Sequence, residues 1–289
     1  MDIVYSIAEV REKISEARIR GLSIGFVPTM GFLHEGHLSL VRESRKHTRY
    51  QVMSIFVNRM QFNDPKDFDA YPIDLERDFK LAREAGVDLV FVPDEKEIYS
   101  DRKTYIDMDI FTDHLCGSAR PGHFRGVFTV VGKLFNIIQP DVSVFGQKDI
   151  QQAVSIEKMV FDLNFPVKII ISPTVREEGG LAMSSRNKHL KEAERKSALV
   201  IYRGLQKAEE MLKTGERRWE TIRAEMGKII ASGNPRSIDY ITAVSYADLQ
   251  PVSKMAEKSV IAIASFFGAT RLIDNMIIEI KGDGVTCIY

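Results

Sequence analysis

Short apolar runs alternate with longer amphipathic segments in the first half of the chain. Two of the amphipathic segments, residues 37–47 and 74–85, place most of their apolar side chains on one helical face. The apolar runs are typical of buried strands and cover residues 23–27, 51–57, 87–92, 142–145 and 167–171. Strands and helices in alternation predict an α/β fold, with a parallel sheet covered on both faces.

The pattern changes after about residue 173. Residues 189–213 form one long helical pattern, and residues 219–230 form a second. Three apolar segments follow that are typical of strands, at residues 237–244, 259–265 and 276–280. We therefore expect a larger α/β domain over residues 1–174 and a smaller α+β domain over residues 175–289.

Composition narrows the classes of partner. The 289 residues carry 40 basic and 40 acidic side chains, so nothing indicates a global basic surface for nucleic acid or anionic membrane. The longest apolar stretch, residues 260–269, is too short to span a bilayer, and the N-terminal residues lack an apolar signal core. Two cysteines are too few for a disulfide framework or a Cys-rich zinc site. We expect a cytoplasmic protein.

Unusual polar clusters follow most of the predicted strands of the first domain. In an open parallel sheet, ligands bind outside the carboxyl ends of the strands. The clusters are PTMGFLHEGH (28–37), NRMQF (58–62), GQKD (146–149) and PTVREEGGLAMSSR (173–186). Their shared position predicts one composite site.

PTMGFLHEGH has the features of a phosphate site. Gly31 and Gly36 permit tight turns, and a helix starting near His37 would direct its N–H groups and dipole at an anion. His34 and His37 are three residues apart, so both rings can donate to the same phosphate. The alternative is a turn with two surface histidines. A zinc site is disfavoured because no third ligand is evident nearby.

Two further clusters carry cations and hydroxyls. Lys148 suits a β- or γ-phosphate, and Asp149 would orient Lys148 or bind a ribose hydroxyl; the alternative is a solvated turn. Ser184 and Ser185 can donate to phosphate oxygens, and Arg186 can bind them with its fork of N–H groups. A helix N-cap is the alternative for this second cluster. The preceding GG pair, residues 179–180, predicts a mobile loop that closes over the phosphates.

Neutral amides lie beside the same predicted edge. Asn58, Gln61 and Gln152 would suit a small polar substrate with hydroxyls and a carboxylate, although ordinary loop polarity explains them equally well. A basic loop at residues 120–131 is expected to form a wall of the site.

Taken together, these motifs resemble the nucleotidyltransferase superfamily, and more narrowly the pantothenate synthetase (pantoate–β-alanine ligase) family. The resemblance spans residues 28–275. It is carried by six blocks in order: PTMGFLHEGH, FVNRMQF, RPGHFRGVFTVVGKLFNIIQPD, FGQKDIQQ, PTVREEGGLAMSSRN and ATRLIDN.

The resemblance implies a fold and a reaction. The first domain would be a Rossmann-like doubly wound domain, the second a smaller lid, and the protein a homodimer. The reaction would be the condensation of pantoate with β-alanine, driven by ATP with Mg²⁺, giving pantothenate, AMP and pyrophosphate through a pantoyl adenylate. Asp78 and Asp149 are candidate metal contacts, but the metal ligands are not identified.

The resemblance also implies roles for individual residues. His37 would donate a proton to the phosphates, and Gln61 and Gln152 would hold pantoate. The residues expected to stabilise the transition state are His34, His37, Lys148, Ser184, Ser185 and Arg186. Those expected to line ATP are Met30, Gly31, Phe32, Leu33, His34, Glu35, Gly36, His37, Gly146, Gln147, Lys148, Asp149, Val175, Met183, Ser184, Ser185 and Arg186.

Three positions depart from the family's usual pattern: Arg59 replaces a common Pro, Ile73 a common Arg, and Gly179 a common Asp. Arg59 raises the question of how the loop carrying Gln61 is held, since Pro would have fixed its φ. The alternatives are another adenylate- or cytidylate-forming transferase of the superfamily, or a nucleotide-binding module without turnover. Zero net charge disfavours a tRNA-binding role.

Overall fold

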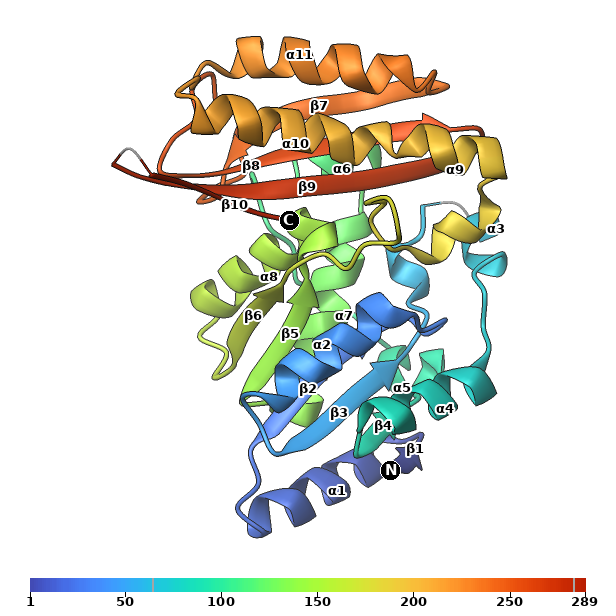
Figure 1. Cartoon of the computed structure of the whole chain (residues 1–289). Coiled ribbons are helices and arrows are strands. Elements are labelled where there is room, and N and C mark those ends of the chain that lie inside the picture. Colours follow the sequence, from blue (N-terminus) through green and yellow to red (C-terminus); the bar gives the residue numbers. More distant parts are fainter. Residues whose placement is uncertain (64, 283) are drawn as a thin grey trace. The chain divides into compact units, whose positions relative to one another are not determined.

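A computed structural model describes residues 1–63, 65–282 and 284–289. Its contacts divide the chain into two compact units (Figure 1). Unit 1 comprises Met1–Thr112, Cys116–Gly146 and Gln152–Ser172, and unit 2 comprises Asp113–Leu115, Gln147–Gln151 and Pro173–Tyr289. The main division falls at residues 172/173, close to the predicted 174/175. The assignment of residues 147–151 to unit 2 differs from the predicted contiguous domains.

Unit 1 is built on a parallel sheet with the strand order β1-β4-β3-β2-β5-β6. Every strand pair recorded in it is parallel, for example Phe26 beside Val52 between β2 and β3. The predicted α/β fold is therefore confirmed. The strands are β1 Asp2–Val4, β2 Ile24–Thr29, β3 Tyr50–Ile55, β4 Leu89–Phe91, β5 Val142–Gly146 and β6 Lys168–Ser172.

The parallel sheet is buried on both faces because neighbouring strand residues point in opposite directions. Phe26 belongs to the core that contains α1 and α7 residues, whereas its neighbour Val27 belongs to the core that contains α2 and α4 residues. This double cover explains why apolar residues predominate on both faces of the strands. The helical segments in chain order are α1 Ile7–Ile19, α2 Glu35–Arg45, η1 Arg59–Gln61, α3 Pro65–Asp69, α4 Leu75–Ala85, α5 Glu95–Tyr99, α6 Leu115–Ala119, α7 His123–Ile138, η2 Gln147–Asp149 and α8 Ile150–Asp162.

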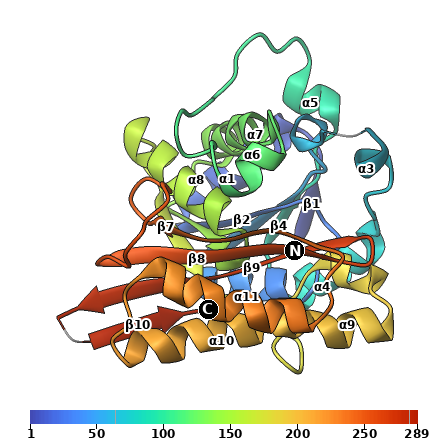
Figure 2. The ribbon, with the colours of Figure 1, turned by 90° about the horizontal axis from the view of Figure 1, so that it is seen from above.

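Unit 2 is a four-stranded antiparallel sheet in the order β10-β9-β8-β7. Helices α10 and α11 lie along this sheet (Figure 2), and their apolar side chains share one core with those of β8 and β9. The predicted α+β character is confirmed. The elements are η3 Ser185–His189, α9 Glu192–Ala198, α10 Val200–Lys213, α11 Trp219–Ser232, β7 Ser237–Ser245, β8 Lys258–Phe267, β9 Thr270–Lys281 and β10 Gly284–Ile288.

Several element boundaries differ from the sequence expectation. The helical pattern predicted over 189–213 is divided into η3, α9 and α10, with a break at Leu199. Strands β1 and β10 and helix α1 were not predicted. Within the described residues, no helix has the length and apolar character required to cross a membrane.

Candidate active site

The loop between β2 and α2 has an unusual backbone that a buried carboxylate holds in place. Gly31 and Phe32 both have positive φ, +81° and +51°, a conformation that is costly for a residue with a side chain. The carboxylate of Asp78, on α4 and 1% exposed, accepts hydrogen bonds of 2.7 Å from the backbone N–H groups of both Phe32 and Leu33. Burial raises the pKa of Asp78, and the two N–H donors oppose that shift. Asp78 thus supports the loop, which argues against the metal contact considered for it.

His34 and His37 both use their Nδ1 atoms to accept backbone hydrogen bonds at the start of α2. His34 Nδ1 accepts from Gly36 N, and His37 Nδ1 accepts from His34 N, each at 3.2 Å. A nitrogen that accepts carries no proton, so Nε2 bears the hydrogen in each neutral ring. The ring centroids are 4.1 Å apart. The two histidines therefore form a pair of Nε2–H donors held in one tautomer.

The helix begins at Glu35, two residues before the predicted start, with His34 as its N-cap. His34 occupies the Gly36 N–H, so fewer N–H groups remain for an anion than predicted. A Cβ at Gly36 would lie 2.9 Å from two atoms of the His34 ring. Gly36 is therefore needed to give the ring room, whereas Gly31 is needed for its backbone conformation.

The amides that follow β3 are joined to the same loop. Gln61, on η1 and 8% exposed, directs Nε2 to the Met30 sulfur at 2.7 Å. Asn58 is almost fully buried, and its Nδ2 donates to the Gly126 carbonyl and to Gln61 Oε1. Its Oδ1 accepts from the Tyr99 hydroxyl at 3.0 Å. These contacts support a positioning role for Asn58, and a direct contact with substrate remains a prediction.

The basic loop and α7 hold Gln61 through its backbone. His123 Nδ1 lies 2.7 Å from the Gln61 carbonyl oxygen, and Arg120 donates to the same oxygen at 3.2 Å. A Cβ at Gly126 would lie 2.5 Å from the Met60 carbonyl oxygen, so α7 can approach η1 only because residue 126 is glycine. These contacts join the basic loop to η1, and its role as a wall of the site stays a prediction.

Replacing Gly126 with alanine should displace η1 and weaken the use of whatever substrate Gln61 binds. The clash is with backbone, so we expect a loss of about 1–3 kcal/mol in stability, as for other overpacked sites. Gly132→Ala on the same helix is the matched control, because the one close clash of its Cβ would be with the flexible end of the Ile106 side chain and not with backbone. Thermal unfolding and steady-state kinetics of both variants would test this. Equal behaviour of the two variants would contradict the close-approach argument.

The GQKD turn leaves β5 at Gly146 and forms η2. Lys148 Nζ lies 3.2 Å from Asp149 Oδ2, which agrees with the prediction that Asp149 orients Lys148. Gln147 is 1% exposed, and its side chain donates to the Ile288 carbonyl at 2.7 Å. The side-chain amide of Gln147 is thus hydrogen-bonded within unit 2, so any contact of Gln147 with a ligand would be made by its backbone.

Residues 175–183 form a hydrogen-bonded hairpin. Glu177 N donates to the Leu181 carbonyl at 2.8 Å, and Met183 N donates to the Val175 carbonyl at 2.9 Å. Gly180 has φ +101°, and a Cβ there would lie 2.1 Å from the Tyr202 ring. The prediction that the glycine pair encodes a mobile loop is therefore not supported by this geometry. The glycines permit a tight turn and the close approach of the tyrosine.

The MSSR cluster begins η3. Ser184 is its N-cap and accepts from Arg186 N at 3.3 Å, so the N-cap interpretation describes the local structure correctly. Ser185 is half-buried and Arg186 is exposed. A cap and a phosphate contact are compatible, because a serine hydroxyl that accepts can still donate its own hydrogen.

Three further candidates, Glu35, Gly146 and Gln152, belong to unit 1. Gln152 lies half-buried on α8. Glu35 is exposed and pairs with Arg42. Within the described ranges, no group of three or more His, Cys, Asp or Glu side chains is arranged to hold a metal ion.

The three departures from the family pattern have different surroundings. The Arg59 guanidinium lies 5.3 Å from the Phe68 ring centroid, and the hydrogen bonds of Asn58 and Gln61 hold the turn in which the common Pro is missing. Ile73 is exposed, and nothing in the structure explains its substitution. Gly179 has φ +88°, a conformation that glycine adopts without strain.

Comparison with known families now decides the assignment. The sequence model of the family described as pantoate-beta-alanine ligase matches residues 2–277. The chain belongs to this family. A pantothenate synthetase from Moorella thermoacetica is 52% identical over 283 residues, which cover 97% of this chain and 100% of that protein. One from Thermoanaerobacter sp. is 51% identical over 96% of this chain and 98% of its own length. The family resemblance of the six blocks is confirmed, and with it a ligase that forms an amide bond.

Solved structures of the family share the fold. Pantothenate synthetase from Thermus thermophilus is 40% identical, with a TM-score of 0.89, over 95% of this chain and 98% of its own. Pantoate-beta-alanine ligase from Francisella tularensis, solved with beta-gamma ATP and beta-alanine, is 34% identical with a TM-score of 0.77, over 95% of this chain and 97% of its own. The Rossmann-like sheet with a smaller C-terminal domain is therefore the family fold.

Proposed function

We propose that this chain condenses pantoate with β-alanine at the expense of ATP, through a pantoyl adenylate. The observation that carries the proposal is the His34–His37 pair, whose Nε2–H donors share one loop with Met30, the neighbour of Gln61. Donors for a phosphate and an amide for a small acid thus lie in adjoining segments of unit 1. The full family match and the ATP and β-alanine bound to the Francisella relative support this assignment.

The chemistry needs no nucleophile from the enzyme. A pantoate carboxylate oxygen attacks the α-phosphorus of ATP, the bond from that phosphorus to the bridging oxygen breaks, and pyrophosphate leaves. The β-alanine amine then attacks the acyl carbon, AMP leaves with the former carboxylate oxygen, and the amine loses a proton. Charge gathers on phosphoryl oxygens in the first step, so positioned donors are the main source of rate.

The proposed roles follow the chemistry of each side chain. His37 donates through Nε2 to the phosphates, and His34 contacts ATP beside it. Lys148, Ser184, Ser185 and Arg186 supply the remaining cations and hydroxyl donors, and Gln61 and Gln152 bind pantoate. Burial of the reacting groups protects the adenylate from water.

Magnesium enters this proposal as part of the substrate, MgATP. The described residues offer no three-ligand cage, and Mg²⁺ commonly binds through one or two carboxylates together with substrate phosphates. Asp149 is exposed and is the carboxylate that lies next to Lys148, so it is the side chain we propose beside the metal. The homodimeric state and the cytoplasmic location form part of the proposal and rest on the family resemblance.

One assay tests the proposed function. Purified protein is incubated with MgATP and pantoate, with and without β-alanine, and AMP and pyrophosphate are measured. We expect pyrophosphate to depend on pantoate, and AMP release to be accelerated by β-alanine. Absence of pantoate-dependent pyrophosphate would reject the proposal, whereas turnover with a different acid would favour another transferase of the superfamily.

Replacing Gln152 with methionine should weaken the use of pantoate more than the use of ATP. Loss of one substrate hydrogen bond corresponds to a rise of roughly tenfold in the KM for pantoate. Gln151→Met is the matched control, because Gln151 is buried and donates to the His114 carbonyl at 2.8 Å. Steady-state kinetics with each substrate varied in turn give the comparison. Equal losses for pantoate and ATP would show that Gln152 is structural.

A further inference from the structure

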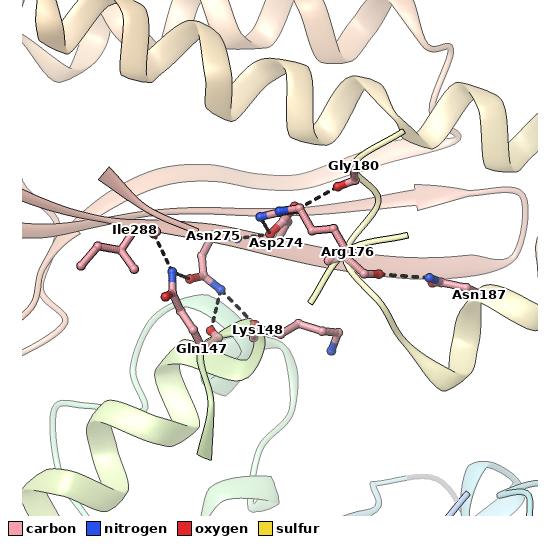
Figure 3. Close-up of polar contacts among 9 residues, drawn as sticks. Gln147, Lys148, Arg176, Gly180, Asn187, Asp274, Asn275 and Ile288 are labelled. Atoms are coloured by element: carbon pink, nitrogen blue, oxygen red, sulfur yellow. Dashed lines mark hydrogen bonds and ion pairs between the residues drawn. The ribbon is translucent and has the colours of Figure 1, made fainter. Parts of the chain in front are cut away.

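Two adjacent polar residues of β9 have no role in the proposed chemistry, although they belong to the block ATRLIDN. Asp274 and Asn275 are 3% and 1% exposed. Leu272 and Met276, which lie near them on the same strand, belong to the apolar core. Burial of polar groups is costly unless each one is hydrogen-bonded. Their partners therefore indicate what these residues are for (Figure 3).

Asn275 binds the backbone of the turn that carries Lys148. Its Nδ2 donates to the carbonyl oxygens of Gln147 and Lys148, at 2.9 and 3.0 Å. Its Oδ1 accepts from Gln147 Nε2 at 3.3 Å, and the same Nε2 donates to the Ile288 carbonyl. One amide thus fixes two successive peptide groups of η2. These hydrogen bonds fix the position of the Lys148 backbone, from which its side chain extends. They also help to explain why residues 147–151 belong to unit 2.

Asp274 binds the hairpin that precedes Ser184. Its carboxylate accepts from Arg176 Nη1 at 2.6 Å and from Nη2 at 3.1 Å. Arg176 Nη1 also donates to the Gly180 carbonyl, and its guanidinium lies 4.3 Å from the Tyr202 ring centroid. Asn187 continues the network by donating to the Ala182 carbonyl at 3.0 Å. The ion pair therefore anchors the first arm of the hairpin and, through Arg176, its turn, while Asn187 binds the second arm that leads into Ser184–Arg186.

The alternation of side chains along a strand explains why one dipeptide can serve both segments. Consecutive strand residues point to opposite faces of a sheet. Asp274 shares a face with Leu272 and Met276, the face packed against the helices, and Asn275 points to the other face. The two segments of unit 2 that carry predicted phosphate contacts are thus anchored at adjacent positions of one strand.

We propose that Asp274 and Asn275 are positioning residues for the ligase reaction, and that they hold the Lys148 turn and the Ser184–Arg186 segment in register with each other. This inference rests on the proposed function, because it assigns phosphate chemistry to those two segments. The proposal gives neither residue a contact with the reacting atoms. Asn275 acts through Lys148, and Asp274 acts through Arg176 and the hairpin.

A double-mutant cycle tests the Asn275 arm. Asn275→Leu and Asn275→Asp keep the size of the side chain but remove both N–H donors. We expect each to lower kcat for pantoate-dependent pyrophosphate release roughly 10- to 100-fold, as for a misplaced catalytic group, with the KM for pantoate little changed. In a Lys148→Met background, the same changes should cause little further loss, because their effect passes through Lys148. Losses that multiply in the double variant would overturn the proposal.

The Asp274 arm is tested in the same way. Asp274→Leu combined with Arg176→Met removes the ion pair without leaving an isolated buried charge. We expect a fall of roughly tenfold in kcat. In an Arg186→Met background, the same double change should cause little further loss. A fall that is fully independent of Arg186→Met would refute a role through the hairpin.

A control separates positioning from loss of stability. Ile278 lies on the same strand and is fully buried in the core, and its apolar side chain cannot form a hydrogen bond with either segment. Ile278→Ala should lower the melting temperature but leave kcat near the unmodified value below the transition. If Ile278→Ala lost as much kcat as Asn275→Leu at equal folded fraction, Asn275 would be merely structural.

The outcome for the unmodified protein distinguishes the two proposals. If it releases pantoate-dependent pyrophosphate, the proposed function holds and the cycles decide the positioning roles. If it does not, the proposed function fails, and the same cycles are measured as MgATP affinity by calorimetry. Non-additive losses of affinity would then uphold the positioning roles, and additive losses would reject them.

Discussion

Replacing His37 with asparagine is expected to lower pantoate-dependent pyrophosphate release by about 10²–10³-fold, the effect of removing one preorganised donor. The reason is that the two ring nitrogens of His37 have different roles. Nδ1 accepts from His34 N and supports the helix start, whereas Nε2 carries the hydrogen. Asparagine Oδ1 stands close to the position of Nδ1 and also accepts, so the variant keeps the backbone contact and loses the donor.

His37→Gln provides the complementary variant, because its amide N–H lies near the position of Nε2 while the acceptor at the δ position is lost. We expect His37→Gln to retain more activity than His37→Asn and to melt at a lower temperature. Pyrophosphate release and thermal unfolding, measured on both variants, would show whether the more active variant is also the less stable one. Near-normal turnover of His37→Asn would remove His37 from the role of proton donor.

Replacing Lys148 with methionine should produce the second large effect, also about 10²–10³-fold on pyrophosphate release. The side chain of Lys148 is 18% exposed, so its ammonium is partly shielded from water and would interact strongly with the phosphate that we propose beside it. Methionine keeps the length and the apolar stem, and the change therefore isolates the charge. The loss should fall on kcat and kcat/KM together, as expected for a group that acts in the transition state.

Lys158→Met is the matched control for Lys148→Met. Lys158 pairs with Asp162 and stacks on Phe161, and it has no part in the proposed chemistry. Its substitution should leave turnover within about twofold, because exposed ion pairs contribute little. Similar losses in the two variants would indicate a general effect of removing positive charge.

Sequence periodicity predicted the elements with long or strongly apolar patterns. Strands β2, β3 and β5 were recognised because both of their faces are largely buried and apolar residues predominate in them. Helix α1 was missed because its buried face consists of only Val10, Ile14 and Ala17 among many charges. The break at Leu199 is marked by no Gly or Pro, so no local signal existed for it.

The candidate motifs were visible in the sequence, whereas the residues that hold them in place were not. Asp78 is 46 positions from Phe32, and Asn275 is 128 positions from Gln147. Spacing within a motif cannot indicate partners that only the tertiary fold brings together. Asn275 and Asp274 directly precede the predicted apolar strand at residues 276–280, and that position was an available sign, because a polar residue must find a partner when buried.

The polar dipeptide of β9 also makes the strand unusually sensitive to insertions and deletions. A shift of one residue moves every side chain of a strand to the opposite face. In β9 such a shift would move the carboxylate and the amide to the opposite faces of the sheet, so Arg176 and the Lys148 turn would each lose the side chain that now binds them. The relative position of two segments that are far apart in the sequence therefore depends on the register of a single strand. For that strand, the number of residues matters as much as their identity.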